Sequence, residues 1–184
     1  MLDVKTYEPY VVKIRDSSLK SNGSRNGIRI QSSLFSANQR IEISNCTLAG
    51  HRTEIEMNMY TQYKTVTHPA PEIEIKRTII IRDNNLSIIP HQKGVGLKVS
   101  CSDIEYAQPS VMIKDVLFSS TMNYKLTTIL PSVVYMEFVQ NVSFVDCSFT
   151  GNRGTPIVAY SSHFSVSGTI NFVNNTGYEA ARRG

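Results

Sequence analysis

Three aspartates at matching places of a repeated pattern are the side chains of this sequence best placed to do chemistry. Asp83, Asp115 and Asp146 each follow an alternating apolar stretch. If those stretches stack as neighbouring strands, the carboxylates lie ~4.8 Å apart in one row. Stacked carboxylates repel unless water or a cation separates them, so the row is a candidate Ca²⁺ site or a source of acid and base groups for polysaccharide cleavage. The simpler interpretation, which we favour, is that each aspartate occupies a turn and hydrogen-bonds nearby backbone.

Two pairs of carboxylates at i and i+2 could serve glycoside chemistry, which needs two carboxyl groups facing one cleft. Residues i and i+2 of a strand share a face, so Glu72 could cooperate with Glu74, and Asp103 with Glu105. Alternating acidic residues on the solvent face of a strand more often serve only solubility. We therefore assign no catalytic residue.

The remaining reactive side chains lack a recognisable spacing. The four histidines show no metal-ligand spacing, and no phosphate-cradling, dinucleotide or Gly-x-Ser-x-Gly motif is present. Cys46 and Cys147 occupy the same place in repeats that are not neighbours, whereas a disulfide needs Cα atoms within about 7 Å. We therefore expect buried free thiols, no bound metal and no cofactor.

Short alternating stretches must position these residues. Apolar and polar residues alternate in five segments, 28–30, 41–43, 55–59, 73–76 and 97–101. A period of two places one set of side chains in a core and the other in water, as in a β-strand. No long apolar pattern with helical spacing and caps is present, so we expect an all-β chain.

A gapless internal match indicates that the strands repeat. Residues 41–52 align with residues 142–153 with three identities, Cys, Gly and Arg, and four conservative pairs. The shared frame has apolar residues at its first, third and eighth places and, in most copies, Asp or Asn at its fifth. Frames begin at residues 12, 41, 79, 111 and 142, with looser copies at 28 and 157. Intervals of roughly thirty residues indicate coils of two or three short strands, each of which buries its apolar face only against the next coil.

These intervals predict a right-handed parallel β-helix, or solenoid, of about five to seven coils. We expect a single β-helix domain over residues 1–184, a fragment of a longer repeat protein, with loop insertions near 61–71, 90–96 and 121–131. An interior aromatic stack is expected from the residues at the eighth place of their frames, Phe35, Phe118, Phe149 and Phe164. The alternative all-β fold is a β-sandwich, which would show antiparallel hairpins between successive frames.

The ends of the frames resemble the repeats of right-handed β-helix surface proteins. An apolar residue is followed three places later by asparagine at Leu19-x-x-Asn22, Phe35-x-x-Asn38, Phe149-x-x-Asn152 and Phe172-x-x-Asn175. Together with Asn45-Cys-Thr-Leu and Asp146-Cys-Ser-Phe, this is similar to repeats in the polymorphic outer-membrane proteins of chlamydiae and in large extracellular β-helix proteins of simple animals. The stretch from Gly154 to Glu179 looks most like the animal proteins, but Ala180-Ala-Arg-Arg183 departs from the Gly-Gly-Ala-apolar element that usually follows there. The resemblance covers the C-terminal quarter well and the rest loosely; it implies a fold and a surface setting, and no reaction.

Five sequons favour an extracellular or cell-surface location. The acceptor pattern Asn-x-Ser/Thr makes five asparagines candidates for glycosylation, Asn22, Asn45, Asn85, Asn141 and Asn174. No secretory signal peptide is visible behind Met1, and no stretch approaches the apolar length needed to span a bilayer. The formal net charge is +4, but the basic residues are scattered, so we expect no nucleic acid partner.

The sequence therefore predicts a non-catalytic structural or binding module of a cell-surface or secreted, adhesin-like glycoprotein. Its rigid face would bind protein or glycan ligands, and the pattern leaves its oligomeric state open. The alternative is a carbohydrate-active β-helix enzyme, either a polysaccharide lyase or a glycoside hydrolase. That class requires a concave face on which two or three acidic residues and an arginine converge.

Overall fold

The computed structural model describes nine ranges of the chain, which consist of strands and short connections. They are residues 1–6, 11–21, 26–33, 39–60, 71–83, 95–101, 108–121, 132–175 and 180–183. Strands in these ranges form three parallel sheets of seven, six and six strands, which we call sheets A, B and C. None of the described segments is a helix long and apolar enough to cross a membrane.

Each coil contributes one strand to each sheet, in the order A, B, C. Sheet A consists of β1 (Leu2–Thr6), β4 (Ile28–Ser33), β7 (Thr53–Tyr60), β10 (Val95–Cys101), β13 (Val134–Glu137), β16 (Ile157–Tyr160) and β19 (Ala180–Arg183). Sheet B consists of β2 (Val11–Arg15), β5 (Arg40–Ser44), β8 (Glu72–Lys76), β11 (Ser110–Lys114), β14 (Asn141–Val145) and β17 (His163–Ser167). Sheet C consists of β3 (Ser18–Lys20), β6 (Thr47–Ala49), β9 (Ile79–Asp83), β12 (Leu117–Thr121), β15 (Ser148–Thr150) and β18 (Asn171–Val173).

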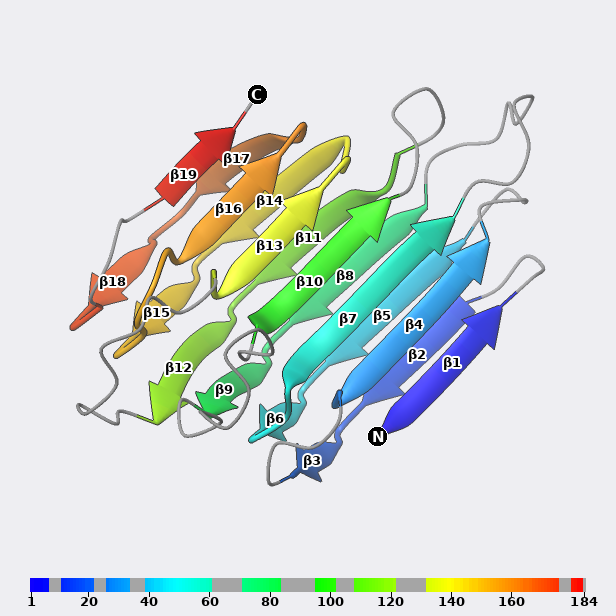
Figure 1. The fold of residues 1–184 in the computed structure, drawn as a ribbon, viewed down its shortest axis with the longest axis horizontal. Coiled ribbons are helices and arrows are strands. Elements are labelled where there is room, and N and C mark those ends of the chain that lie inside the picture. The colour runs from blue at the N-terminus through cyan, green and yellow to red at the C-terminus, as the bar shows by residue number, and fades with distance from the viewer. Residues whose placement is uncertain are drawn as a thin grey trace.

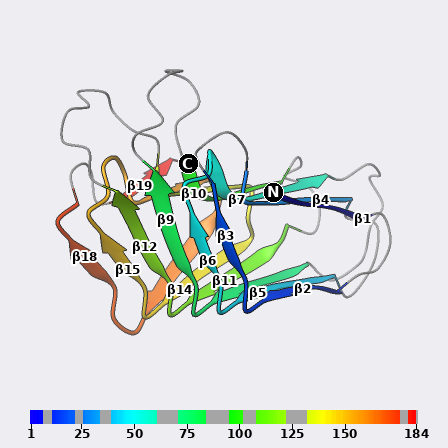
Figure 2. The same cartoon turned by 90° about the horizontal axis from the view of Figure 1, so that it is seen from below.

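The three sheets wrap around one elongated core. Figure 1 shows the strands of sheet A side by side in front of sheet B, advancing from the N-terminal to the C-terminal end of the stack. Figure 2 shows sheets A and B facing each other while sheet C closes one side. The chain is thus a right-handed parallel β-helix of about six coils, as the sequence predicted.

Alternating apolar residues fill the core. In β8, Ile73 and Ile75 are buried while Glu72 is exposed, because successive side chains of a strand point to opposite faces. Ile73 pairs in register with Ile41 of β5 and with Val111 of β11, so the buried side chains of neighbouring coils stack on one another. The same arrangement recurs in sheet A, which confirms the strands predicted from alternation.

Every pairing between the described strands is parallel. β5, for example, pairs in parallel with β2 on one side and β8 on the other, although these strands lie far apart in the sequence. Antiparallel hairpins between successive frames, which a β-sandwich requires, are absent from the described ranges. The alternative fold is therefore excluded.

One predicted frame was placed six residues too late. Ile73, not Ile79, pairs with Ile41 and Val111, so the true frame of that coil begins at Ile73. Residues Ile79 and Ile81 belong to β9 of sheet C, where the buried apolar residue is Ile80. The error arose because β9 is apolar on both faces, and alternation cannot then determine which set of side chains faces the core.

The predicted phenylalanine stack forms only in part. Phe118 and Phe149 are fully buried in sheet C and stack with ring centroids 4.8 Å apart. Phe172, which the prediction omitted, continues the stack at 5.2 Å from Phe149. Phe164 does not belong to it, because its backbone lies in β17 of sheet B and pairs with Val142. The frames that begin at 28 and 157 start in sheet A, so their eighth places do not match those of the other frames; Phe35 lies outside the described residues.

The three predicted loop insertions fall between strands. They lie between β7 and β8, between β9 and β10, and between β12 and β13. Their predicted boundaries need small corrections, because Val95 and Gly96 already belong to β10 and Thr121 still belongs to β12. Most of the remaining residues in these insertions lie outside the described ranges.

Candidate functional site

The turns between sheets B and C contain the predicted acidic places. At the first five of these turns one residue has a positive φ of 47° to 54°, a left-handed conformation that Asn and Asp tolerate better than other side chains, and Gly168 at the sixth has a φ of 68°. The residues at the first five turns are Asp16, Asn45, Arg77, Asp115 and Asp146. Their amides connect the coils, as in the bond from Asp115 N to Val145 O at 3.0 Å. Asp115 and Asp146 therefore hold turn positions in neighbouring coils.

Asp83 does not join this column. It ends β9 in sheet C, where its backbone pairs with Thr121, and Arg77 occupies the turn that the prediction gave to Asp83. The predicted row of three aspartates is therefore wrong, for the same reason that the frame at 79 was misplaced. Within the described ranges, no group of three or more His, Cys, Asp or Glu side chains could hold a metal ion. Asp146 instead accepts a hydrogen bond from Thr169 N at 2.8 Å, as a turn residue should.

At four of these five turns, the residue after the left-handed position caps the turn; these residues are Ser17, Cys46, Thr78 and Cys147. Thr78 Oγ1 donates to Lys76 O at 2.9 Å, and Cys46 Sγ lies 3.2 Å from Ser44 O. Cys147 lies at the same place, and burial raises the pKa of its thiol. Thr78 occupies this place in the coil that follows the coil of Cys46. Cys46 and Cys147 are buried free thiols, and their place in the turns indicates a structural role; Cys101 is buried at the end of β10.

Three of the five sequon asparagines lie in described ranges, and all three are exposed. Asn45 and Asn174 have positive φ in turns, and Asn141 begins β14 on the outer face of sheet B. Asn45 Nδ2 donates to Asp16 Oδ1 at 3.0 Å. Asn22 and Asn85 lie outside the described residues, as do Asp103 and Glu105.

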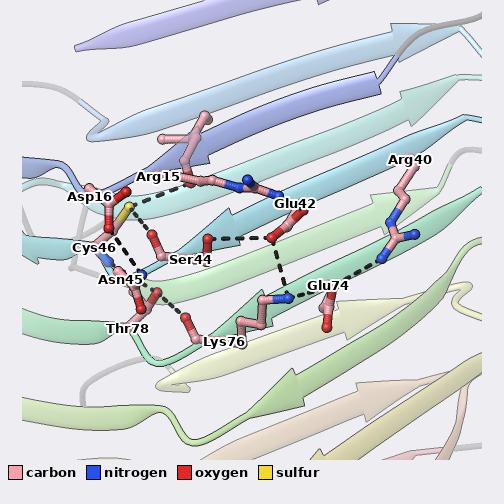
Figure 3. Close-up of polar contacts among 11 residues, drawn as sticks. Arg15, Asp16, Arg40, Glu42, Ser44, Asn45, Cys46, Glu74, Lys76 and Thr78 are labelled. Carbon is pink, nitrogen blue, oxygen red and sulfur yellow. Dashed lines mark hydrogen bonds and ion pairs between the residues drawn. The ribbon is translucent and has the colours of Figure 1, made fainter.

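A network of ion pairs covers one part of the outer face of sheet B (Figure 3). Arg15 contacts Glu42 at 2.7 Å, and Lys76 bridges Glu42 and Glu74 at 3.3 Å each. Arg40 completes the network by contacting Glu74 at 3.2 Å. The hydrogen bond from Arg15 is the main reason that the pKa of Glu42 falls to about 2, with Lys76 adding to the effect and desolvation opposing it. These five side chains, which we call the paired network, hold each other in place.

A groove of about 340 Å³ crosses β5, β8, β11 and β14 and shares Arg40 and Glu74 with the paired network. Its outward side chains come from two rows in register across these strands, and Ile73 and Val111 also line it. The outward residues are Arg40, Glu72, Glu74, Ser110, Met112, Asn141 and Ser143. The groove thus brings together Glu72 and Glu74, one of the two carboxylate pairs identified in the sequence.

The groove differs from the paired network in its hydrogen bonding. The side chains of Glu72, Ser110, Asn141 and Ser143 make no hydrogen bond or ion pair with another described residue. Met112 is 45% exposed between them. The groove therefore combines free hydroxyl, amide and carboxylate groups with one apolar side chain, a combination typical of small-ligand sites.

Sequence reasoning missed the groove as a site. Its residues come from four strands, and only the register between the coils brings them together. The one available signal was the run of polar residues at outward places of the alternating strands, which is also the ordinary composition of a solvent face. The misplaced frame at 79 removed β8 from the alignment and hid even that signal.

A second polar cluster, also missed, is sealed inside the corner between sheets C and A. His51, Glu54 and Arg82 are at most 3% exposed, and Glu54 accepts hydrogen bonds from both the backbone and the ring of His51. Burial lowers the pKa of Arg82 to about 10, while the charge of Glu54 opposes that shift. Arg82 Nη1 also donates to Arg153 O at 3.4 Å. Because no side chain of the trio reaches solvent, the cluster serves the packing of the corner.

The groove on sheet B is therefore the best candidate for a functional site in the described ranges. Comparison of the chain with known proteins does not identify a function for this groove. No protein-family model matches the chain, and no similar protein was found among the curated proteins or the solved structures.

Proposed function

We propose that the chain is a non-catalytic structural and binding module of a cell-surface or secreted, adhesin-like β-helix protein, and that the sheet B groove binds its ligand. The volume of the groove lies at the lower end of the range for small-ligand sites, roughly 300–1,000 Å³. The groove lies on a rigid stack of strands. Its residues therefore lose little conformational entropy when a ligand binds. A ligand running along the stack would contact several coils at once.

The proposal rests on a difference between two parts of the outer face of sheet B. The charges of the paired network satisfy one another, whereas the neighbouring Ser110, Asn141 and Ser143 side chains have no described partner. Hydrogen-bonding groups beside an exposed Met112 offer a ligand bonds that replace bonds to water and break none within the protein. The bonds gained on binding are therefore concentrated in the groove.

A glycan suits the groove better than a protein strand. β8 and β11 are each paired on both sides, so their backbone groups are already hydrogen-bonded and cannot take an added strand. Recognition must then use side chains. Hydroxyl and amide side chains can donate to and accept from sugar hydroxyls, and the exposed Met112 can cover the apolar face of a sugar ring.

The surface setting rests on the sequons and on the likeness to surface β-helix repeats. Two of the described sequon asparagines, Asn45 and Asn174, lie outside the groove and are accessible to a glycosylating enzyme. The repeats resemble those of the polymorphic outer-membrane proteins and of large extracellular animal proteins, which supports an adhesin-like role.

Glycan-array binding followed by titration calorimetry tests the proposal. Ser143→Tyr fills the groove with a bulky ring, while its register partner Ser165 on β17 is outward and exposed but does not line the groove. We expect at least one glycan class to bind, Ser143→Tyr to weaken that binding by about tenfold or more, a loss of roughly 1.4 kcal/mol, and Ser165→Tyr to leave it unchanged. Equal binding by Ser143→Tyr and the wild type, or no binding above background, would contradict the proposal.

A carbohydrate-active enzyme is the second candidate, favoured by one observation. Glu72 and Glu74 lie on the same face of β8, with Cα atoms ~6.6 Å apart for an extended strand, and both line the groove. Two carboxyl groups facing one cleft are the minimum for glycoside hydrolysis. Release of reducing ends or unsaturated products from a bound polysaccharide, abolished by Glu72→Gln, would support this candidate. Binding without product release would exclude it.

A further inference from the structure

We propose that the groove selects glycans that carry free amino groups, such as polymers of deacetylated hexosamine, and that Glu72 binds their ammonium group. This inference rests on the proposed function, because it names the class of ligand for the same groove. It starts from an imbalance of charge among the residues that line the groove.

Arg40 is the cation nearest to Glu72 in register, but it contacts a different carboxylate. Arg40 is the cross-strand partner of Glu72, but its guanidinium contacts Glu74 at 3.2 Å. Lys76, on the same strand, contacts Glu42 and Glu74. Among the described residues, no cation contacts the carboxylate of Glu72.

The charge of the groove lining therefore favours a cationic ligand. Arg40 contributes one positive charge to the lining, while Glu72 and Glu74 contribute two negative charges. Glu74 also contacts Lys76, so among the described residues the charge left without an ion-pair partner is that of Glu72. The chain as a whole is positive, with a net charge of +4, so this negative site is local and does not follow from composition. Uronates and sulfated sugars would meet the free carboxylate of Glu72, and like charges at close range cost binding energy.

An ammonium group would satisfy Glu72 without disturbing the paired network. The exposed carboxylate of Glu72 can accept a charge-assisted hydrogen bond, which is shorter and stronger than a bond between neutral groups. Arg40 and Lys76 keep their contacts to Glu74, so the binding of the ligand breaks no ion pair. The network thus leaves Glu72 as the one groove carboxylate available to the ligand.

The other groove residues fit the rest of an amino sugar polymer. Ser110 lies beside Glu72 in register, and Asn141 lies one strand further, so Glu72 and Asn141 are separated by two strand spacings, ~9.6 Å. At that separation the two side chains contact different sugar residues of one polymer. Met112 and Ser143 form the second row, where Met112 can pack against a ring and Ser143 can bond a hydroxyl.

Titration calorimetry with three tetrasaccharides tests the inference: a glucosamine tetramer, its N-acetylated counterpart and a galacturonate tetramer. At pH 5.5 and low salt we expect the order glucosamine, N-acetylglucosamine, galacturonate, with the first binding at least about tenfold tighter than the second. Glu72→Gln keeps the shape of the side chain but removes its charge, and it should abolish this preference. Asp115→Asn is the matched control, because it removes an exposed carboxylate at a turn outside the groove lining and Asn tolerates the positive φ there.

The outcomes separate the inference from the proposed function. If the N-acetylated tetramer binds as tightly as the amine, if the galacturonate tetramer binds best, or if Glu72→Gln keeps the preference, the inference is wrong while the groove remains a glycan site. If Asp115→Asn reduces the preference as much as Glu72→Gln does, the effect comes from overall charge and the inference is also wrong. If none of the three tetramers binds, both the inference and a glycan-binding function for this groove are contradicted.

Discussion

Arg15 and Glu42, which are 27 residues apart in the chain, are joined across neighbouring coils by a contact of 2.7 Å. The contact exists only because β2 and β5 pair in register, which places Arg15 two residues beyond Lys13, the register partner of Glu42, on the same outer face. It connects the stacking of the coils to the electrostatics of sheet B. Its effect on the ionisation of Glu42 gives a direct test of the fold.

Acid should destabilise the protein through Glu42. The pKa of Glu42 is lowered from 4.5 to about 2 in the folded chain, so its contribution to stability is fully present above pH 4.5 and is lost as the pH falls towards 2. Glu42→Gln should therefore lose less stability than the wild type between pH 5 and pH 2. Thermal melts across this range measure the difference.

Arg15 provides the matched variant, because its hydrogen bond is the largest cause of the shift. Arg15→Gln should reduce the acid sensitivity by a large part of the effect of Glu42→Gln, and the double variant should add little to either. If all variants lose stability in parallel with the wild type, the paired network does not exist as described.

Phe149 should be the most sensitive position of the aromatic stack. Its ring is fully buried between Phe118 and Phe172, at centroid distances of 4.8 and 5.2 Å. Phe149→Ala leaves a cavity and should cost about 3–5 kcal/mol of unfolding free energy, measured by urea denaturation. Phe172→Ala, at a ring that is 41% exposed, should cost clearly less. Equal losses at both positions would show that the stack is not ordered as described.

Arg77 should be a position where a substitution stabilises the chain. Its φ of 47° is a left-handed conformation that costs an ordinary L-residue roughly 1–2 kcal/mol. Arg77→Asn should raise the unfolding free energy by about 0.5–1 kcal/mol, because Asn tolerates this conformation better. At the corresponding turn of the last coil, Gly168→Ala should destabilise, since a Cβ there would lie 2.2 Å from Asp146 Oδ1. A loss of stability in Arg77→Asn would contradict the assignment of the turn.

The sequence predicted the architecture because stacking coils repeat a simple pattern. The segments that begin at Ile41 and Val142 share the same alternation and similar turn residues, Asn45-Cys46 and Asp146-Cys147, and this likeness was enough to predict parallel coils. The prediction failed at β9, where Ile79, Ile80 and Ile81 are apolar on both faces and alternation carries no information on direction. It failed again at Phe164, because distance along the chain does not show in which sheet a residue lies.

The groove could not be predicted for a different reason. Glu72, Ser110 and Asn141 become neighbours only through the register of β8, β11 and β14, and the connections between these strands differ in length. Arg40 and Lys76 contact Glu42 and Glu74 and leave Glu72 without a cation. This choice of partners depends on the directions of the side chains, which the spacing of residues in the sequence does not reveal. Individual residues were visible in the sequence, but their arrangement was not.

The central claim, that the groove on sheet B is the ligand site, is tested most directly by mapping amide chemical shifts during a glycan titration. The ¹⁵N-labelled chain is titrated with the glucosamine tetramer and, in parallel, with the N-acetylated tetramer. We expect saturable shifts at the backbone amides of Glu72, Ser110, Met112 and Ser143, and no shifts at Ser165 on the same face or at Lys98 on the outer face of sheet A. Shifts that cluster on sheet A or sheet C, or no saturable shifts with either tetramer, would contradict the claim.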